Sequence, residues 1–253
     1  MPPALRGLRA AFVFFTRIPV GGFPYRKEDY AWALAHGPFV GLVLGGVLGA
    51  LEHGFLFGLA PLPAAALTLG ASLLLTGAFH EDGLADTSDA LGGGYDRARV
   101  LAILKDSRIG SFGGAALAWS LLLRAALLAA LGSSVAWAWP LVGCAARVGP
   151  VWLVVAMPYV TAEQDAKSRT VAQAGVPQAI VATLWFLGAA GVALYARFLS
   201  LPRAGALVAA LAVITAVSGW RYRVRAGGIT GDFLGATEQL GEIAVLAVLA
   251  WTA

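Results

Sequence analysis

Charged residues and cysteine are both scarce in this chain of 253 residues, and each shortage excludes a class of protein. Charged side chains make up 13% of the sequence, whereas a soluble domain typically carries about 25%. Apolar residues make up 59% of the sequence. A soluble fold cannot bury the side chains of so many apolar residues, so a membrane protein is expected. The single cysteine, Cys144, lies in an apolar run. It excludes both an intrachain disulfide and a cysteine-cluster metal site.

The excess of basic residues is also small. The formal net charge is +4, and the sequence contains no basic helix and no basic stripe with interleaved aromatic residues. Nucleic-acid-binding proteins usually concentrate Lys and Arg in such a patch. We therefore expect no nucleic-acid partner and attribute the excess to the positive-inside rule of membrane proteins.

Long apolar runs predict an all-α fold, a polytopic transmembrane helix bundle that forms one domain over residues 1–253. At 1.5 Å per residue, about 20 apolar residues cross the roughly 30 Å hydrocarbon core. Runs of suitable length cover 31–51, 62–79, 111–132, 135–158, 177–199 and 203–220, and the tail 239–253 is a candidate seventh span. Residues 4–20, which end at Pro19, predict an N-terminal interfacial helix rather than a cleaved signal peptide.

Four glycines in the first span recur every fourth residue, at Gly37, Gly41, Gly45 and Gly49. This spacing places them on one helix face and predicts close packing against another helix.

The basic residues are distributed unequally between the two sets of loops. With the N-terminus in the cytoplasm, fourteen of the eighteen Lys and Arg residues lie on the inner side: Arg6, Arg9, Arg17, Arg26, Lys27, Arg97, Arg99, Lys105, Arg108, Lys167, Arg169, Arg221, Arg223 and Arg225. Only Arg197 and Arg203 lie on the outer side. The positive-inside rule therefore predicts a cytoplasmic N-terminus. Most acidic residues share the inner loops, which predicts chemistry at that face.

The segment His80–Asp89 follows the second predicted span and carries the densest group of acids. If the helix continues inward, Asp82, Asp86 and Asp89 lie at i, i+4 and i+7 on one face. Like charges so placed repel one another unless a cation lies among them, and carboxylates bridged to phosphate oxygens suit Mg²⁺. We expect these aspartates to bind Mg²⁺. His80 is a supporting group and a candidate general base.

Two further segments offer groups for phosphate. Lys105, Ser107 and Arg108 precede the third span, and they predict phosphate contacts, with Asp106 as an additional metal ligand. Residues 227–235 form a glycine-rich turn that leads into an apolar segment. Backbone N–H groups of such a turn bind anions, so we expect substrate contacts at Gly228, Thr230 and Gly231, and a metal ligand at Asp232.

Two arginines fall inside predicted spans, where a charge is costly and functional by default. We expect Arg147 to face the bundle interior, toward the substrate. Arg124 is expected to snorkel or to pair with an acid.

Four segments appear in a characteristic order: Phe14–Pro19, His80–Asp89, Lys105–Gly110, and Gly227–Asp232 with Gly235 and Glu238. Together they resemble the cobalamin synthase family, the adenosylcobinamide-GDP ribazoletransferases. Residues 158–169 depart from the Arg/Gly-rich stretch that this family carries after its fourth span.

The resemblance implies a Mg²⁺-dependent transferase in the inner membrane, with its active site facing the cytoplasm. A hydroxyl of α-ribazole, or of its 5′-phosphate, would attack the cobinamide-linked phosphorus of adenosylcobinamide-GDP. GMP would leave, and adenosylcobalamin or its 5′-phosphate would form. The expected partners are these small molecules and the lipid bilayer. A homo-oligomer is a further possible assembly.

Three alternatives are weaker. CDP-alcohol phosphotransferases begin their motif with Asp-Gly-x-x-Ala-Arg, and the segment starting at Asp82-Gly83 departs from it by carrying Asp86. A cation-coupled transporter would concentrate its charges near the bilayer midplane, whereas most charges here lie in loops on one face. A non-catalytic membrane scaffold would not need the clustered acids.

Overall fold

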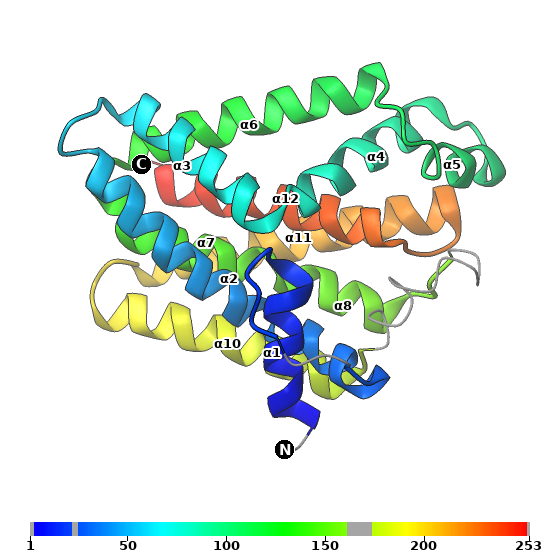
Figure 1. The fold of residues 1–253 in the computed structure, drawn as a ribbon, viewed down its shortest axis with the longest axis horizontal. Coiled ribbons are helices and arrows are strands. Elements are labelled where there is room, and N and C mark those ends of the chain that lie inside the picture. The colour runs from blue at the N-terminus through cyan, green and yellow to red at the C-terminus, as the bar shows by residue number, and fades with distance from the viewer. Residues whose placement is uncertain (1–2, 22–24, 161–173, 252–253) are drawn as a thin grey trace.

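The computed structural model describes residues 3–21, 25–160 and 174–251, which form a bundle of helices (Figure 1). In chain order the elements are α1 (Pro3–Phe15), α2 (Lys27–Phe55), α3 (Pro61–Thr76), α4 (Phe79–Gly93), α5 (Arg97–Ile103), α6 (Ser111–Leu131), η1 (Gly132–Ser134), α7 (Val135–Ala146), α8 (Val148–Ala156), α10 (Val176–Tyr195), α11 (Leu201–Ala226) and α12 (Gly231–Ala250). Among the described residues, the only β-contact is an isolated bridge between Tyr159 and Ile229. The predicted all-α fold is confirmed.

Five helical stretches are long and apolar enough to cross a membrane, or six if the bent pair α3–α4 counts as one span. The sequence predicted six to seven. The counts differ because residues 111–156 form one nearly continuous helical stretch. Figure 1 shows that the chain reverses within it, between α6 and α7. The predicted short tail is instead part of the 20-residue helix α12.

The surface of these stretches is apolar, as contact with lipid requires. Leu74 is 80% exposed, Leu122 is 71% exposed and Val192 is 68% exposed. Single exposed apolar residues are common in soluble proteins, but so many on long helices indicate a lipid-facing surface. The protein is therefore a multi-pass membrane protein.

The connections at the two ends of the bundle form two groups (Figure 1). The segment around α5 and the α11–α12 turn lie at one end, on the right of the figure. The α2–α3 and α10–α11 connections lie at the opposite end, together with the C-terminus. The segments that carry the predicted chemistry therefore share one end of the molecule.

Three glycines of the α2 stripe, Gly41, Gly45 and Gly49, pack against α7, and Gly37 lies against the Phe15 ring of α1, so the predicted close packing is confirmed. A Cβ atom at Gly41 would collide with the backbone of Gly143, and one at Gly45 would collide with the backbone of Trp139. Only glycine permits this backbone-to-backbone approach.

A bend of 92° separates α3 from α4, and it corrects the expectation that the second span continues inward as a straight helix. Gly77 and Ala78 adopt left-handed conformations, with φ of 69° and 55°. The N-terminal segment supports the bend, since Arg17 N–H donates to the Leu75 carbonyl (2.7 Å) and Phe14 packs on Phe79 (5.2 Å between ring centroids). In Figure 1, α1 crosses the direction of α2.

Candidate active site

Helix α4 has a buried face and an open face. His80 is 5% exposed and Glu81 is 6% exposed, whereas the next residue, Asp82, is exposed and Asp86 is half-buried. Successive residues of a helix point about 100° apart, so neighbouring acids face different surroundings. The open face is the predicted metal face, and the buried face carries a separate set of ion pairs.

The N-terminal end of α12 packs directly on α4. A Cβ atom at Gly83 would lie 2.8 Å from the Asp232 carbonyl oxygen and 3.2 Å from the Gly235 Cα atom. These two glycines let the helix backbones meet, and their contact places Asp232 beside the open face of α4. Asp232 and Asp82 are thus neighbours although 150 positions separate them in the sequence.

Three carboxylates converge at this junction, and we call Asp82, Asp86 and Asp232 the carboxylate face. The Asp86 carboxylate interacts electrostatically with those of Asp82, Asp232 and Asp89, and Asp232 interacts with Asp82. Within the described residues, no member of this face forms an ion pair with Lys, Arg or His. The face thus gathers negative charge that the described side chains leave unbalanced.

The donor set fits a hard divalent cation. Carboxylate oxygens are what Mg²⁺ prefers, and Mg²⁺ usually keeps several waters and takes only one or two protein carboxylates beside substrate phosphates. Across the described ranges, no group of three His, Cys, Asp or Glu side chains is arranged so that it could hold a metal ion by itself. A site with only one or two protein carboxylates, completed by phosphate oxygens, agrees with both observations. The roles of Asp82, Asp86 and Asp232 as ligands stay predictions.

Asp89 has a different set of contacts. Its Oδ2 atom accepts a hydrogen bond from Gly110 N–H (2.6 Å) and its Oδ1 atom accepts one from Gly113 N–H (2.8 Å). These donors belong to the first turn of α6, where backbone N–H groups lack helical partners and favour an anion. Asp89 therefore fixes the start of α6 against α4, and a metal contact by Asp89 stays a prediction.

The segment 105–108 is a solvent-exposed turn. Arg108 donates to Asp106 through Nη2 (2.7 Å) and Nε (2.9 Å). These hydrogen bonds lower the pKa of the Asp106 carboxyl to about 2. The charged neighbours of Asp106 are Arg108 and Arg99 rather than the carboxylate face. The structure thus does not bring Asp106 together with the other predicted ligands, and Lys105, Ser107 and Arg108 are exposed beside it.

The glycine-rich turn before α12 is shorter than predicted, because the helix begins at Gly231. Thr230 is buried and its hydroxyl accepts from Phe233 N–H (3.3 Å), which caps α12. Gly228 lies against the Pro158 carbonyl, and Ile229 N–H donates to that carbonyl (2.9 Å). These contacts join the turn to residues 158–160. Substrate contacts by Gly228, Thr230 and Gly231 stay predictions.

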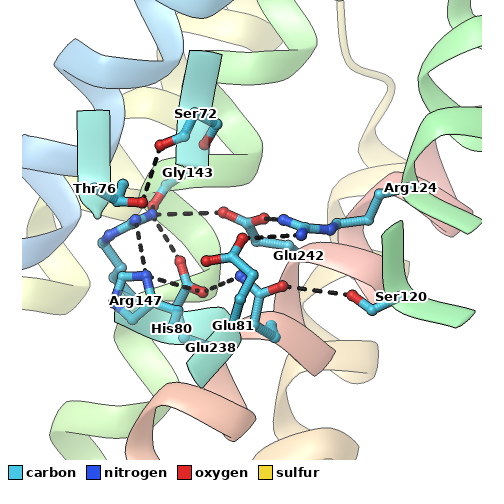
Figure 2. Close-up of polar contacts among 11 residues, drawn as sticks. Ser72, Thr76, His80, Glu81, Ser120, Arg124, Gly143, Arg147, Glu238 and Glu242 are labelled. Atoms are coloured by element: carbon cyan, nitrogen blue, oxygen red, sulfur yellow. Dashed lines mark hydrogen bonds and ion pairs between the residues drawn. The ribbon is translucent and has the colours of Figure 1, made fainter. Parts of the chain in front are cut away.

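Behind the carboxylate face lies a buried network of ion pairs, shown in Figure 2. Arg124 of α6 is 1% exposed and binds Glu242 (2.7 Å) and Glu81 (2.9 Å). Arg124 thereby joins α6 to both α12 and α4, which confirms the prediction that it pairs with an acid.

A second arginine extends this network. Arg147, at the break between α7 and α8, binds Glu238 (2.9 Å) and donates to the Gly143 carbonyl (2.7 Å). His80 Nδ1 lies 3.4 Å from Glu238 and 3.5 Å from the Arg147 guanidinium. Arg147 faces the bundle interior as predicted, and its substrate contact stays a prediction.

Sequence reasoning missed the roles of Glu81, Glu238 and Glu242. The signal that pointed to them was the pair of arginines inside predicted spans, since a buried arginine needs a carboxylate partner. The identity of each partner depends on helix packing, which no local pattern encodes.

Comparison with known proteins decides the family. The model of the family described as cobalamin-5-phosphate synthase matches residues 7–250. The chain belongs to this family. It is 39% identical to an adenosylcobinamide-GDP ribazoletransferase of Polaromonas sp., with 92% of each chain covered. It is 41% identical to one of Bradyrhizobium diazoefficiens, over 96% of this chain and 92% of that protein. No solved structure matches.

Membership in the cobalamin-5-phosphate synthase family gives the carboxylate face a chemical context. The chain is a transferase of cobalamin biosynthesis, acting in the assembly of the nucleotide loop. A reaction on a diphosphate-linked substrate needs positive charge near phosphate oxygens, and the binding of a metal ion by the carboxylates of this face stays a prediction.

Proposed function

We propose that this enzyme joins α-ribazole, or its 5′-phosphate, to adenosylcobinamide-GDP, and that Mg²⁺ at the carboxylate face supports the reaction. A hydroxyl of the ribazole attacks the phosphorus attached to cobinamide, the bond from that phosphorus to the GMP oxygen breaks, and GMP leaves. Membership in the family supports the overall reaction. The convergence of Asp82, Asp86 and Asp232 is the structural observation that supports its location.

The chain's own groups divide the work. Carboxylates among Asp82, Asp86 and Asp232 would hold Mg²⁺ together with phosphate oxygens of the substrate, and the bound ion would supply positive charge for the diphosphate. Lys105 and Arg108, exposed on the neighbouring turn, supply cations to the phosphates. Arg108 exchanges its Asp106 partner for phosphate when substrate arrives.

The buried residues act indirectly in this proposal. His80 lies beneath the carboxylate face, 5% exposed, so its burial favours a positioning role over that of a general base. Glu81 and Arg124 hold α4 against α6, and Arg147 with Glu238 holds α12 against α7 and α8. Together they fix the distance between Asp82 and Asp232.

We further propose that the protein lies in the inner membrane with this end facing the cytoplasm. The chemistry-bearing segments share one end of the bundle. The region of α5 and the end of α11 there carry Arg97, Arg99, Lys105, Arg108, Arg221, Arg223 and Arg225, whereas the α10–α11 connection at the opposite end has only Arg197 and Arg203 nearby, as the positive-inside rule requires. A reporter fused at Gly94 is expected to read cytoplasmic, and one at Leu201 periplasmic. The reverse pattern would reject the orientation.

An assay of GMP release tests the activity. The purified protein in liposomes is supplied with adenosylcobinamide-GDP, α-ribazole and Mg²⁺. GMP is expected to appear only when all three are present, together with a cobalamin product identified by mass spectrometry. Release of CMP from a CDP-activated lipid, with no cobalamin product, would instead support an alcohol phosphotransferase. Activity that survives removal of divalent cations with EDTA would reject the metal proposal alone.

A further inference from the structure

A long apolar groove runs between α8, α10 and α11 and shares no residue with the carboxylate face. Its volume is about 690 Å³, which lies within the range of small-molecule binding sites. Trp152, Leu153, Phe186, Leu187, Leu211 and Ala216 are among its lining residues. All lining residues except Met157 belong to stretches that are apolar and long enough to span a membrane. The groove is therefore open to the acyl region of the bilayer.

The groove is charged at one end only. Arg223 is its single charged lining residue. Arg223 is exposed, and within the described part of the chain it forms no ion pair. Trp220, also exposed, lies one helical turn away on α11 and lines the same groove. Aromatic residues next to a basic residue are typical of the level of lipid headgroups.

The length of the groove matches one lipid chain with its headgroup. Its lining on α11 extends from Val208 to Arg223, which corresponds to about 22 Å at 1.5 Å per residue. One leaflet of the hydrocarbon core is about 15 Å deep, half of the roughly 30 Å core. An acyl chain would occupy the apolar part, and a few ångströms remain for glycerol and phosphate beside Arg223.

We propose that this groove binds a glycerophospholipid, whose acyl chain lies along α11 and whose phosphate binds Arg223. Charge complementarity favours this occupant, because an anionic phosphate is the natural partner of an exposed arginine above an apolar channel. A helix of a second copy would fill the apolar part but would leave Arg223 without an anion. Bound lipid would stabilise the contact of α8 with α10 and α11.

Native mass spectrometry of the full-length protein, purified in mild detergent with added phosphatidylglycerol, tests the proposal. The wild-type protein is expected to retain one phospholipid per chain. Arg223→Gln should raise the apparent Kd about tenfold, and Ala216→Trp, which fills the groove, should abolish retention. Arg221→Gln and Val217→Trp are matched controls, since both residues are exposed on α11 but do not line the groove, and they should retain lipid as the wild type does.

Each result decides for or against the groove. Weakened retention in Arg223→Gln and loss of lipid in Ala216→Trp, with wild-type retention in both controls, supports the proposal. Equal retention in all five proteins, or no retained lipid in the wild type, rejects it. A wild-type dimer that Ala216→Trp converts to a monomer, with no bound lipid in either, shows that a second copy occupies the groove. None of these readouts depends on transferase activity.

Discussion

Removing the charge of Arg124 should destabilise the bundle more than any surface substitution. Arg124 is 1% exposed and neutralises both Glu81 and Glu242. Breaking a buried ion pair by removing one partner costs about 3–5 kcal/mol, because a charge stays buried without compensation. Arg124→Gln leaves Glu81 without its ion-pair partner and leaves Glu242 with only the 3.8 Å contact to Arg147, so we expect a loss near the upper end of that range.

The expected loss is large enough to measure as a melting temperature. For a protein of this size, 1 kcal/mol shifts Tm by about 2–4 °C, so Arg124→Gln should lower Tm by roughly 10–20 °C. Arg124→Lys keeps the charge but lacks the planar guanidinium that reaches two carboxylates at once. Its Tm should therefore lie between those of the wild type and Arg124→Gln. Tm is followed by loss of folded protein after heating in detergent.

A variant without any of the three charges separates the ion pairs from simple packing. The combination Arg124→Met, Glu81→Gln and Glu242→Gln removes the arginine together with both glutamate charges, and neutral replacement of a buried ionic group is often tolerated. We expect it to recover at least half of the Tm lost by Arg124→Gln. Two results would contradict this reasoning. One is a Tm of Arg124→Gln within about 2 °C of the wild type, which corresponds to less than 1 kcal/mol. The other is a Tm of the neutral variant no higher than that of Arg124→Gln.

Three further predictions concern the carboxylate face, the contact of α4 with α12, and the Asp106 turn. Asp232→Asn and Asp86→Asn should each lower kcat by at least about a hundredfold, as loss of electrostatic stabilisation does, while the protein still inserts into the membrane. Near-normal turnover of Asp232→Asn at saturating Mg²⁺ would show that Asp232 is not part of the site. Gly83→Val should separate α4 from α12 and abolish activity, because its Cβ would meet the Asp232 carbonyl, whereas Gly114→Val, which meets nothing within 4 Å, should leave activity near normal. The hydrogen bonds from Arg108 lower the pKa of the Asp106 carboxyl to about 2. The stability that Asp106 gives its turn is therefore present above about pH 4 and is lost as pH falls toward 2. Proteolysis of the turn that accelerates already at pH 5 would contradict this.

Local sequence patterns predicted the structural features that depend on a single helix and on the lipid or water around it. The glycine stripe of α2 is an example, since four small residues on one face are sufficient to predict close packing and the structure places Gly41 against Gly143. The apolar runs predicted the spans for the same reason, because the thickness of the bilayer sets the required length.

The bend between α3 and α4 was not predictable in this way. Gly77 is a common residue for a helix end, but Ala78 also adopts a left-handed conformation, which an alanine rarely does without support. That support comes from Arg17 and Phe14 of the N-terminal segment, about sixty positions earlier. Contacts of this range leave no periodic trace near residue 77, so the sequence suggested a straight helix.

The assignment of individual acids shows the same limit at the site. Glu81 and Asp82 are adjacent, similar in chemistry and equally typical of a metal site, yet one is buried against Arg124 and the other is exposed beside Asp232. The surroundings of the two side chains differ because α6 packs on one side of α4 and the N-terminal end of α12 packs on the other. One helix therefore carries an ion-paired face that fixes its orientation and a charged face that needs a cation. Substitutions at these two neighbours should consequently fail in different assays: Glu81→Gln in thermal stability, and Asp82→Asn in Mg²⁺-dependent turnover.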